Sequence, residues 1–513
     1  MPPSSPDNFP LTAAEASHGE RTSAYQEVLS FLEGLKSLPG SHVLSITEFG
    51  ITTEGRSMPF VVAANPPLAG AQAVMESGKI RILVNANIHA GEVEGKEAVL
   101  MILREIAQGD HSELLKDAVI LFVPIYNADG NERFDRSNRV TQNGPNEGVG
   151  IRPNAMGLDL NRDFIKVEAP ETKAMLGLMR DFDPHVFMDL HTTNGSYHGY
   201  HLTYSPSLST HVDAELDLFN RNTLLPEVRA NMQENHGLRV FDYGNFTEDA
   251  SPEWVTYDHR PRFGTNYVGL RNRISVLSEA YSYFDFSTRI HVTRNFVIEV
   301  LQSCVRHQDE IRQVTGAADE RALVGNWTLG YKTHLGGAER EGVLVGGVED
   351  VILPNNLGTR HVVLPEYEEI EMIVRRRFQS DLQQDYPLAW VLPHATESMH
   401  ELLQLHGVEF SQTTVEKKML IEVFAVDHIQ RNKELFQGHY EIQIFGSWKE
   451  ETRAIPNGSL LIPAHQKLAR VAAQLLEPLS EDSASTWGRL SGWEKQDGLG
   501  QSDSPVWRLP KVD

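Results

Sequence analysis

Apolar strand-like runs alternate with amphipathic helical stretches through the first three-fifths of this 513-residue chain. The strand-like runs are short and rich in Ile, Leu and Val, a pattern typical of strands that are buried on both faces of a sheet. They cover residues 80–88, 118–126, 186–190 and 274–277, and helical periodicity covers residues 23–37, 92–108, 170–180, 216–233 and 287–314. We therefore expect an α/β fold, with a mixed, mostly parallel sheet covered by helices on both faces.

The pattern changes after about residue 318, and the chain is too long for one hydrophobic core. Strand-like runs dominate the remainder, with a helix at 396–406 that Thr396 caps and a late helix at 465–476. The runs are 325–331, 342–353, 361–365, 370–376, 388–392 and 440–445, and residues from about 483 are predicted to form loops. We expect a flexible lead-in over 1–22, an α/β domain over 23–318 and a mostly-β accessory domain over 319–513.

Charge and cysteine content exclude several classes of function. The formal net charge of −24 argues against a nucleic-acid partner, because phosphate binding needs a basic surface. The single cysteine, Cys304, lies in an apolar helical run, which argues against a cysteine nucleophile. No apolar run approaches the length of a membrane span, and the polar N-terminus does not resemble a signal peptide. We expect a cytoplasmic protein, with the mature form of an exported protein as the alternative.

Histidines and acidic residues follow two of the buried strands. His89-Ala90-Gly91-Glu92 comes after the first, and Asp189-Leu190-His191 closes the third. The carboxyl ends of parallel strands meet at one edge of a sheet, where ligands bind. A catalytic zinc ion takes three protein ligands and keeps one position open. We predict one Zn²⁺ per chain, bound by His89, Glu92 and His191.

A third segment, Gly157-Leu158-Asp159-Leu160-Asn161-Arg162, supplies a further carboxylate. A metal-ligating histidine usually donates its other ring N–H to such a group. We assign this role to Asp159, towards His89, with Asp189 as the competing candidate. The acidic residues of the helix after Glu92, Glu94 and Glu97, are expected to cap that helix or to form ion pairs.

Together these segments resemble the zinc carboxypeptidase family typified by carboxypeptidase A. That family has an H-x-x-E pair, a G-x-D-x-N-R segment, a later strand-end His and a catalytic Glu on a further strand. Here the matches are His89 with Glu92, residues 157–162, His191 and Glu279. The resemblance covers roughly residues 20–315 and leaves out the C-terminal third.

The resemblance implies hydrolysis of the C-terminal peptide bond of a peptide with a free carboxylate. It implies Glu279 as the general base and Arg152 as the cation beside the reacting carbonyl. Arg162 with Asn161 matches the group that binds the substrate carboxylate. Tyr257 matches the mobile tyrosine of the family, and Tyr267 is its rival. Asp163, where the family often has Asn, is a departure that places a negative charge next to Arg162.

Two other functions stay open. A zinc amidohydrolase of the aspartoacylase or desuccinylase type resembles the same H-x-x-E and D-x-N-R segments and would cleave an N-acyl amino acid. A non-catalytic protein that binds peptide termini would keep the fold, although it has no need for Glu279. The C-terminal third contains no motif that indicates chemistry of its own.

Overall fold

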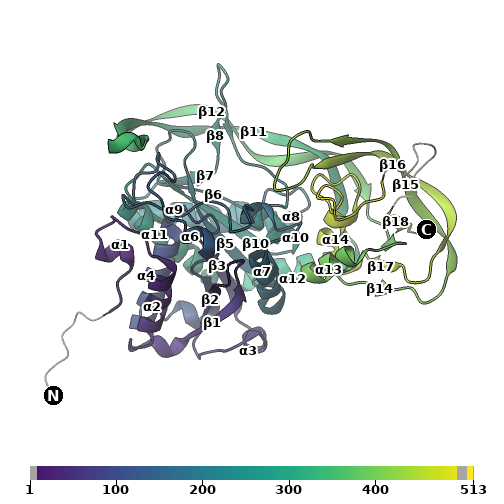
Figure 1. Ribbon diagram of the computed structural model, residues 1–513, viewed down its shortest axis with the longest axis horizontal. Coiled ribbons are helices and arrows are strands. Elements are labelled where there is room, and N and C mark those ends of the chain that lie inside the picture. Colours follow the sequence, from purple (N-terminus) through teal and green to yellow (C-terminus); the bar gives the residue numbers. More distant parts are fainter. Residues whose placement is uncertain (1–8, 494–504, 512–513) are drawn as a thin grey trace.

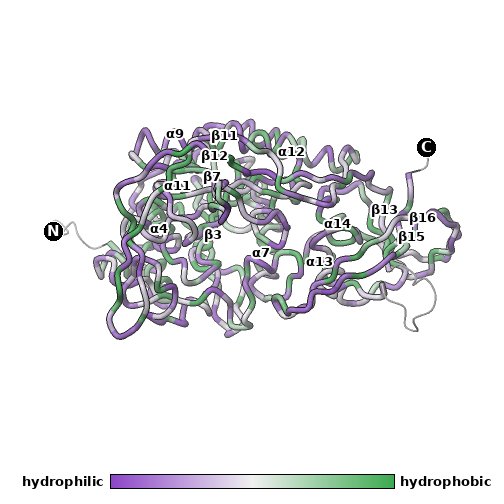
Figure 2. The backbone as a smooth tube through the Cα atoms, turned by 90° about the horizontal axis from the view of Figure 1, so that it is seen from above, coloured by the Kyte–Doolittle hydropathy of each residue, from purple (hydrophilic) through white to green (hydrophobic). Residues whose placement is uncertain are grey.

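The computed structural model describes residues 9–493 and 505–511. Residues up to 318 and the residues from 386 onwards lie side by side along the long axis of the molecule, whereas the hairpin of residues 328–385 lies across the first of these parts (Figures 1 and 2). We call residues up to 318 the N-terminal region and the residues after 318 the C-terminal region.

The N-terminal region is built on an eight-stranded sheet in the order β1-β2-β4-β3-β5-β10-β6-β7. Its four central strands, β4, β3, β5 and β10, are parallel, and the strands that flank them include antiparallel neighbours. The bounds are β1 Leu44–Ile51, β2 Ser57–Ala63, β3 Ile80–Ala86, β4 Ala118–Val123, β5 Val186–Thr193, β6 Leu202–Ser205, β7 Val240–Asp242 and β10 Ile274–Tyr281.

Helices cover both faces of this sheet, which confirms the predicted α/β fold. Alternate strand residues point to opposite faces, so Val84 packs with α2, α4, α9 and α11, whereas Leu83 packs with α7 and α10. The helices are α1 Ala13–Ala16, α2 Tyr25–Leu35, α3 Ala71–Glu76, α4 Glu94–Gln108, α5 Leu114–Asp117, α6 Ala128–Asn131, α7 Pro170–Phe182, α8 Ala214–Phe219, α9 Leu225–His236, α10 Gly264–Leu270, α11 Phe286–Arg306 and α12 Gln308–Val324.

The C-terminal region is rich in long antiparallel hairpins. One sheet has the order β11-β12-β9-β8 and includes two short strands of the N-terminal region; the other has the order β14-β17-β13-β18-β15-β16. The bounds are β8 Asn245–Phe246, β9 Trp254–Val255, β11 Thr328–Ile352, β12 Thr359–Asp385, β13 Ala389–Leu392, β14 Ser411–Gln412, β15 Lys417–Arg431, β16 Ile442–Ile455, β17 Leu460–Pro463 and β18 Trp507–Leu509, with helices α13 Glu397–His406 and α14 Ala469–Leu476.

Several predicted elements differ from the structure. The four strand-like runs between 325 and 376 form only two strands, because the Gly336-Gly337 and Gly346-Gly347 pairs lie within β11 instead of ending it. The predicted helix 287–314 is two helices, since His307 is non-helical and apolar periodicity continues across it. Strand β15 was not predicted, and β18 forms where loops were expected; the pairing of these two strands joins segments that are far apart in the chain.

The two regions share one hydrophobic cluster. Trp390 and Leu403 of the C-terminal region belong to the same buried cluster as Phe187 and Tyr267 of the N-terminal region. Helix α12 continues past residue 318. The C-terminal region therefore covers the face of the central sheet that α7 and α10 line, and the predicted domain boundary at 318/319 stays a prediction.

The described part of the lead-in packs against the N-terminal region. Thr12 and Glu15 cap the short helix α1 reciprocally, and the Glu97 carboxylate accepts hydrogen bonds from Thr22 and Ser23. Residues 1–8 of the predicted flexible lead-in lie outside the described residues, as do residues 494–504 and 512–513 of the predicted C-terminal loops.

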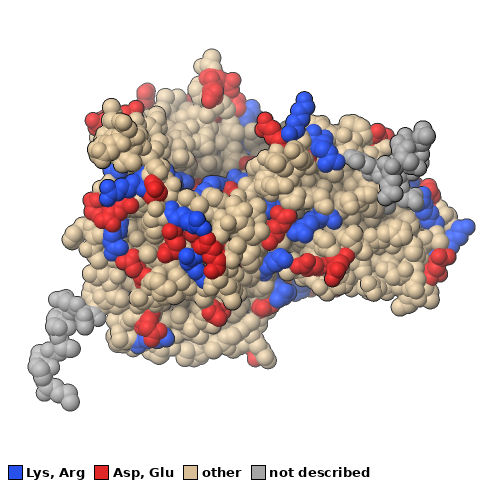
Figure 3. Space-filling view, in the orientation of Figure 1, with Lys and Arg blue, Asp and Glu red and all other residues tan. Residues whose placement is uncertain are grey.

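The charge on the surface and the hydropathy of the helices relate to two expectations, namely that the protein has no nucleic-acid partner and no membrane span. Acidic and basic side chains are interspersed over the face in Figure 3. Within residues 9–493 and 505–511, no helix has the length and apolar character needed to cross a bilayer. The expected lack of a nucleic-acid partner stays a prediction.

Candidate active site

His89 and Glu92 lie in the turn that joins β3 to α4. The Glu92 N–H donates to the carbonyl oxygen of His89 at 2.9 Å, which closes the turn and brings the two side chains to one side. Gly91 between them has no room for a side chain, because a Cβ there would lie 2.6 Å from Cδ of Arg139 and 2.9 Å from the Gly150 carbonyl oxygen. The glycine of the H-x-G-E segment is thus required by close packing.

His191 and Glu279 lie on neighbouring parallel strands. His191 is on β5 and Glu279 is on β10, and the two residues are partners in the register of the sheet. Both strands run further than predicted, to Thr193 and Tyr281, so that each residue lies within its strand. Strand β3 ends beside them, so the carboxyl ends of β3, β5 and β10 meet at one edge, as expected.

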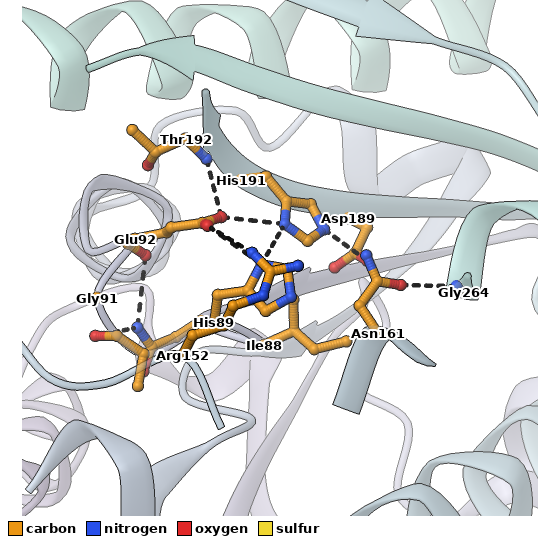
Figure 4. A network of polar contacts seen from close by, with 12 residues as sticks. Ile88, His89, Gly91, Glu92, Arg152, Asn161, Asp189, His191, Thr192 and Gly264 are labelled. Carbon is orange, nitrogen blue, oxygen red and sulfur yellow. Dashed lines mark hydrogen bonds and ion pairs between the residues drawn. The ribbon is translucent and has the colours of Figure 1, made fainter. Parts of the chain in front are cut away.

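The side chains of His89, Glu92 and His191 point towards one another (Figure 4). The two Nδ1 atoms are 3.2 Å apart, and each lies 3.1 Å from an oxygen of Glu92. The outer nitrogen of each ring faces a carboxylate: Nε2 of His89 lies 3.0 Å from Asp159 and Nε2 of His191 lies 2.9 Å from Asp189. The second contact is close but does not have hydrogen-bond geometry. Each competing carboxylate thus accompanies a different histidine.

This donor set fits a divalent metal ion. A histidine whose Nε2–H faces a carboxylate presents an Nδ1 lone pair, and two lone pairs that face each other repel unless a cation lies between them. Two nitrogens bound to one tetrahedral zinc ion are about 3.3 Å apart, since each Zn–N bond is about 2.0–2.1 Å. Among the described residues, His89, Glu92 and His191 are the one group of three ligating side chains this close together, with ligand atoms within 4.8 Å of one another.

Two arginines surround the buried Glu92 carboxylate. Arg139 Nη1 donates to Glu92 Oε1 at 3.0 Å, and Arg152 Nη1 lies 3.6 Å from the same oxygen. Although burial acts to raise it, the pKa of Glu92 is held well below its usual range by His89 and Arg139. Arg152 also donates to Asp159 Oδ2 at 2.8 Å. Glu92 and Asp159 are therefore both carboxylates at neutral pH.

A cavity of about 480 Å³ opens beside these groups. Glu279 lies in its wall, where burial and the negative charge of Glu92 raise the pKa of this carboxyl to about 8, against the opposing effect of His191. The cavity brings together every residue predicted to ligate the metal, to act on the substrate or to bind it: His89, Glu92, Arg152, Asn161, Arg162, His191, Tyr257 and Glu279.

The cavity also distinguishes the two tyrosine candidates. Tyr257 lines it, with its hydroxyl 2.9 Å from Oγ1 of Thr265. Tyr267 is fully buried, and its hydroxyl lies 2.9 Å from Nδ1 of His406 in the C-terminal region.

Other acidic residues near the site point away from the cavity. Asp163 is fully buried; its Oδ1 accepts from Lys166 at 2.6 Å and its Oδ2 from the N–H of Ala169 at 2.9 Å. It is therefore not the counter-charge of Arg162. Glu94 pairs with Thr192 and with Arg289, whose Nε lies 3.4 Å away.

Sequence reasoning missed several cavity residues, among them Arg139, Tyr243 and Phe436. Arg139 lies in the long polar stretch between residues 128 and 161, whose length indicated a functional loop without identifying a residue. Tyr243 follows a short strand, and Phe436 belongs to the loop between β15 and β16. No local pattern distinguishes these three, because only the tertiary fold brings them to the cavity.

Comparisons with known proteins find zinc carboxypeptidases. A family model for zinc carboxypeptidases matches residues 28–262, a range that includes the three candidate ligands and ends before Glu279. Carboxypeptidase 2 of Trichophyton equinum is 23% identical over 465 residues, covering 85% of this chain and 78% of that protein. Carboxypeptidase 2 of Trichophyton rubrum is 22% identical with the same coverage.

Among solved structures, a metallo-carboxypeptidase from Pseudomonas aeruginosa matches with a TM-score of 0.42 and 16% identity, covering 56% of this chain and 70% of that chain. The family match over residues 28–262 and the sequence relatives make this chain similar to zinc carboxypeptidases, and the grouped histidines and glutamate fit that similarity.

Proposed function

We propose that this protein hydrolyses the C-terminal peptide bond of peptides and binds one zinc ion through His89, Glu92 and His191. The observation that carries the proposal is the pair of facing Nδ1 atoms, 3.2 Å apart, each beside an oxygen of Glu92. A zinc ion bound there polarises the substrate carbonyl and lowers the pKa of a water molecule towards neutrality.

Glu279 is proposed as the general base. Its carboxylate takes a proton from the attacking water, whose oxygen bonds to the carbonyl carbon. The same carboxyl then gives the proton to the departing nitrogen as the C–N bond breaks. Burial raises the pKa of this carboxyl, which favours the return of the proton to the departing nitrogen.

Arg152 is proposed to stabilise the oxyanion that forms on the substrate carbonyl. Its guanidinium is held by Asp159 at 2.8 Å, next to the candidate metal ligands, and it lines the cavity. A fixed cation at the place where negative charge develops lowers the barrier, because no reorganisation is needed during the reaction.

Arg162 and Asn161 are proposed to bind the α-carboxylate of the substrate. Arg162 Nη1 donates to the Asn161 carbonyl oxygen at 2.8 Å, and its guanidinium carbon lies 3.9 Å above the ring of Phe263. Burial, with Arg152 and Arg262 nearby, lowers the pKa of Arg162, so an arriving anion would stabilise its charge. Tyr257, at the same cavity, is proposed as the tyrosine that closes over the substrate.

The proposal is tested with matched peptides that carry a free or an amidated C-terminus. Amidation leaves a buried charged donor partly unpaired, at a cost of about 1.5–3 kcal/mol, or about 10- to 100-fold in kcat/KM. Arg162→Ala should lower activity on the free peptide and remove most of the difference between the two. Equal rates of the wild-type protein on both peptides would contradict the carboxypeptidase proposal. Cleavage of N-acetyl-aspartate instead would favour the amidohydrolase.

The metal site is tested by zinc analysis of the purified protein. We expect about one zinc per chain, and we expect His191→Ala to lose most of it because two ligands do not hold zinc tightly. His428→Ala, at an exposed histidine of β15, is the matched control and should keep its zinc. Unchanged zinc content in His191→Ala would show that the proposed ligand set is wrong.

A further inference from the structure

The loop between β15 and β16, residues 432–441, ends in a tight turn. Phe436 and His439 exchange two backbone hydrogen bonds of 2.9 and 3.0 Å. The two residues between them, Gln437 and Gly438, both have positive φ, at +50° and +83°. Two consecutive left-handed residues are the signature of a type I′ turn, which continues the twist of the flanking strands. Phe436 and Gln437 therefore lie at the tip of a long, well-formed hairpin.

Three alternate residues of this loop contact the N-terminal region. Gln437 accepts a hydrogen bond from the main-chain N–H of Asp159 at 2.8 Å. The His439 ring lies 2.8 Å from Glu168, and Glu441 accepts from Arg262 at 2.6 Å. The first of these contacts is to the residue whose carboxylate faces His89. The loop is thus held at three points against the N-terminal region, and one of these, Arg262, lies in the wall of the cavity.

Phe436 turns its ring towards that cavity. It lines the cavity and is half-buried, whereas the preceding residue, Leu435, is 60% exposed. The guanidinium carbon of Arg262 lies 5.2 Å from the centre of the Phe436 ring. Phe436 is accordingly a large apolar side chain that the C-terminal region places in the wall of a site built otherwise by the N-terminal region.

The position of Phe436 points to the part of the substrate that it meets. Its neighbour Arg262 lines the cavity together with Phe263, over whose ring Arg162 stacks. Arg262 is neutralised by Asp482 and by Glu441, which accept its N–H groups at 3.0 and 2.6 Å. Beside Phe436 this wall therefore offers an aromatic surface and an arginine whose charge is already paired, which suits an apolar side chain better than an acidic one.

We propose that Phe436 is a specificity-determining residue, whose ring packs against the side chain of the substrate's terminal residue, and that Gln437 positions it. This inference rests on the proposed function, because it assumes that Arg162 holds the terminal carboxylate. The region without catalytic groups of its own would then set the size and polarity of the preferred terminal residue.

The test compares two blocked dipeptides that end in Phe and in Ala, with the full-length zinc-loaded protein. Phe436→Ala should lower the Phe-to-Ala ratio of kcat/KM about tenfold, since part of the free energy gained by burying an aromatic side chain is lost. The change should appear mainly in KM, because packing on a non-reacting group acts equally on ground and transition states. Leu435→Ala is the matched control and should leave the ratio unchanged.

Two further variants keep the proposal testable if Phe436→Ala does not fold. Phe436→Leu retains an apolar wall and should keep most of the ratio. Gln437→Leu removes the acceptor for the Asp159 N–H and should shift the ratio in the same direction as Phe436→Ala, by a smaller factor. If the ratio is unchanged in both Phe436→Ala and Gln437→Leu, the inference is overturned. If Phe436→Ala does not fold, an unchanged ratio in Gln437→Leu is enough to overturn it. A wild-type protein that cleaves neither peptide would instead refute the proposed function.

Discussion

The N-terminal region reaches the cavity through strand ends and the turns beside them, whereas the C-terminal region reaches it through the tip of one hairpin. His89, His191 and Glu279 follow from the order of three neighbouring parallel strands. Gln437, in contrast, contacts a residue 278 positions earlier in the chain. This difference between the two regions shows that sheet geometry places the reactive groups, while the shape of the substrate site also depends on long-range packing.

The largest effect is expected when one reactive group is removed from the N-terminal region, because this region supplies the groups proposed to act on the substrate. Glu279→Gln should keep zinc and fold but lower kcat by about 10²–10⁴-fold, because the proton acceptor is lost. Zinc content and the unfolding transition are measured alongside the rate. If the rate of this variant is near that of the wild-type protein, another group accepts the proton, and the buried Glu94 would be tested next.

The buried contact between the regions should matter for stability. Arg262 and Asp482 are 2% and 0% exposed at their side chains, and they pair across the interface at 3.0 Å. Asp482→Ala leaves much of the Arg262 charge uncompensated and should lower the free energy of unfolding by about 3–5 kcal/mol. Urea unfolding of both proteins at one pH measures this. A loss below about 1 kcal/mol would mean that Glu441 alone satisfies Arg262.

The interface should also make stability depend on pH through His406 of α13. Its ring contacts the Tyr267 hydroxyl and the Ile165 carbonyl oxygen, and burial, aided by Arg271, lowers the pKa of His406 to about 3. The unfolded chain takes up this proton near pH 6.5 and the folded chain does not. The contribution is therefore complete above about pH 6.5 and is lost as the pH falls towards 3.

Between pH 7 and pH 5 this one group should lower the free energy of unfolding by about 2 kcal/mol. His406→Gln removes the titrating group, so the wild-type protein should lose more stability than the variant over the same interval. Urea unfolding at both pH values gives the two differences. If both proteins lose the same free energy of unfolding, the protonation of His406 does not make stability depend on pH.

The smallest effect is expected at the exposed edge of the same interface. Lys173 of α7 and Glu401 of α13 pair at 2.9 Å with side chains 39% and 55% exposed. Exposed ion pairs contribute about 0–1 kcal/mol, and salt screens them. A double-mutant cycle with Lys173→Ala and Glu401→Ala measures the coupling. A coupling as large as the effect of Asp482→Ala would contradict the expectation that buried contacts at this interface stabilise the protein more than exposed ones.

Much of the N-terminal region could be predicted because its signals are local. The strands β3, β4 and β5 are apolar runs that cannot be exposed to water, and helices α2, α4 and α7 carry apolar stripes at helical spacing. Thr396 was predicted to cap α13, and its hydroxyl accepts from the Met399 N–H at 3.2 Å. The long hairpins were less predictable, because glycine pairs within β11 resemble strand ends.

The residues of the site likewise differ in how far they could be predicted from the sequence. The candidate metal ligands could be predicted from short segments, because ligand type, spacing and strand ends are local features of the chain. The tertiary structure was needed to show that Asp159 accompanies His89 while Asp189 accompanies His191, and that Asp163 turns towards Lys166. Only the tertiary structure brought Arg139 and Phe436 to the cavity. The physical reason is that spacing constrains neighbours along the chain, whereas contacts between distant segments depend on how whole sheets and hairpins pack.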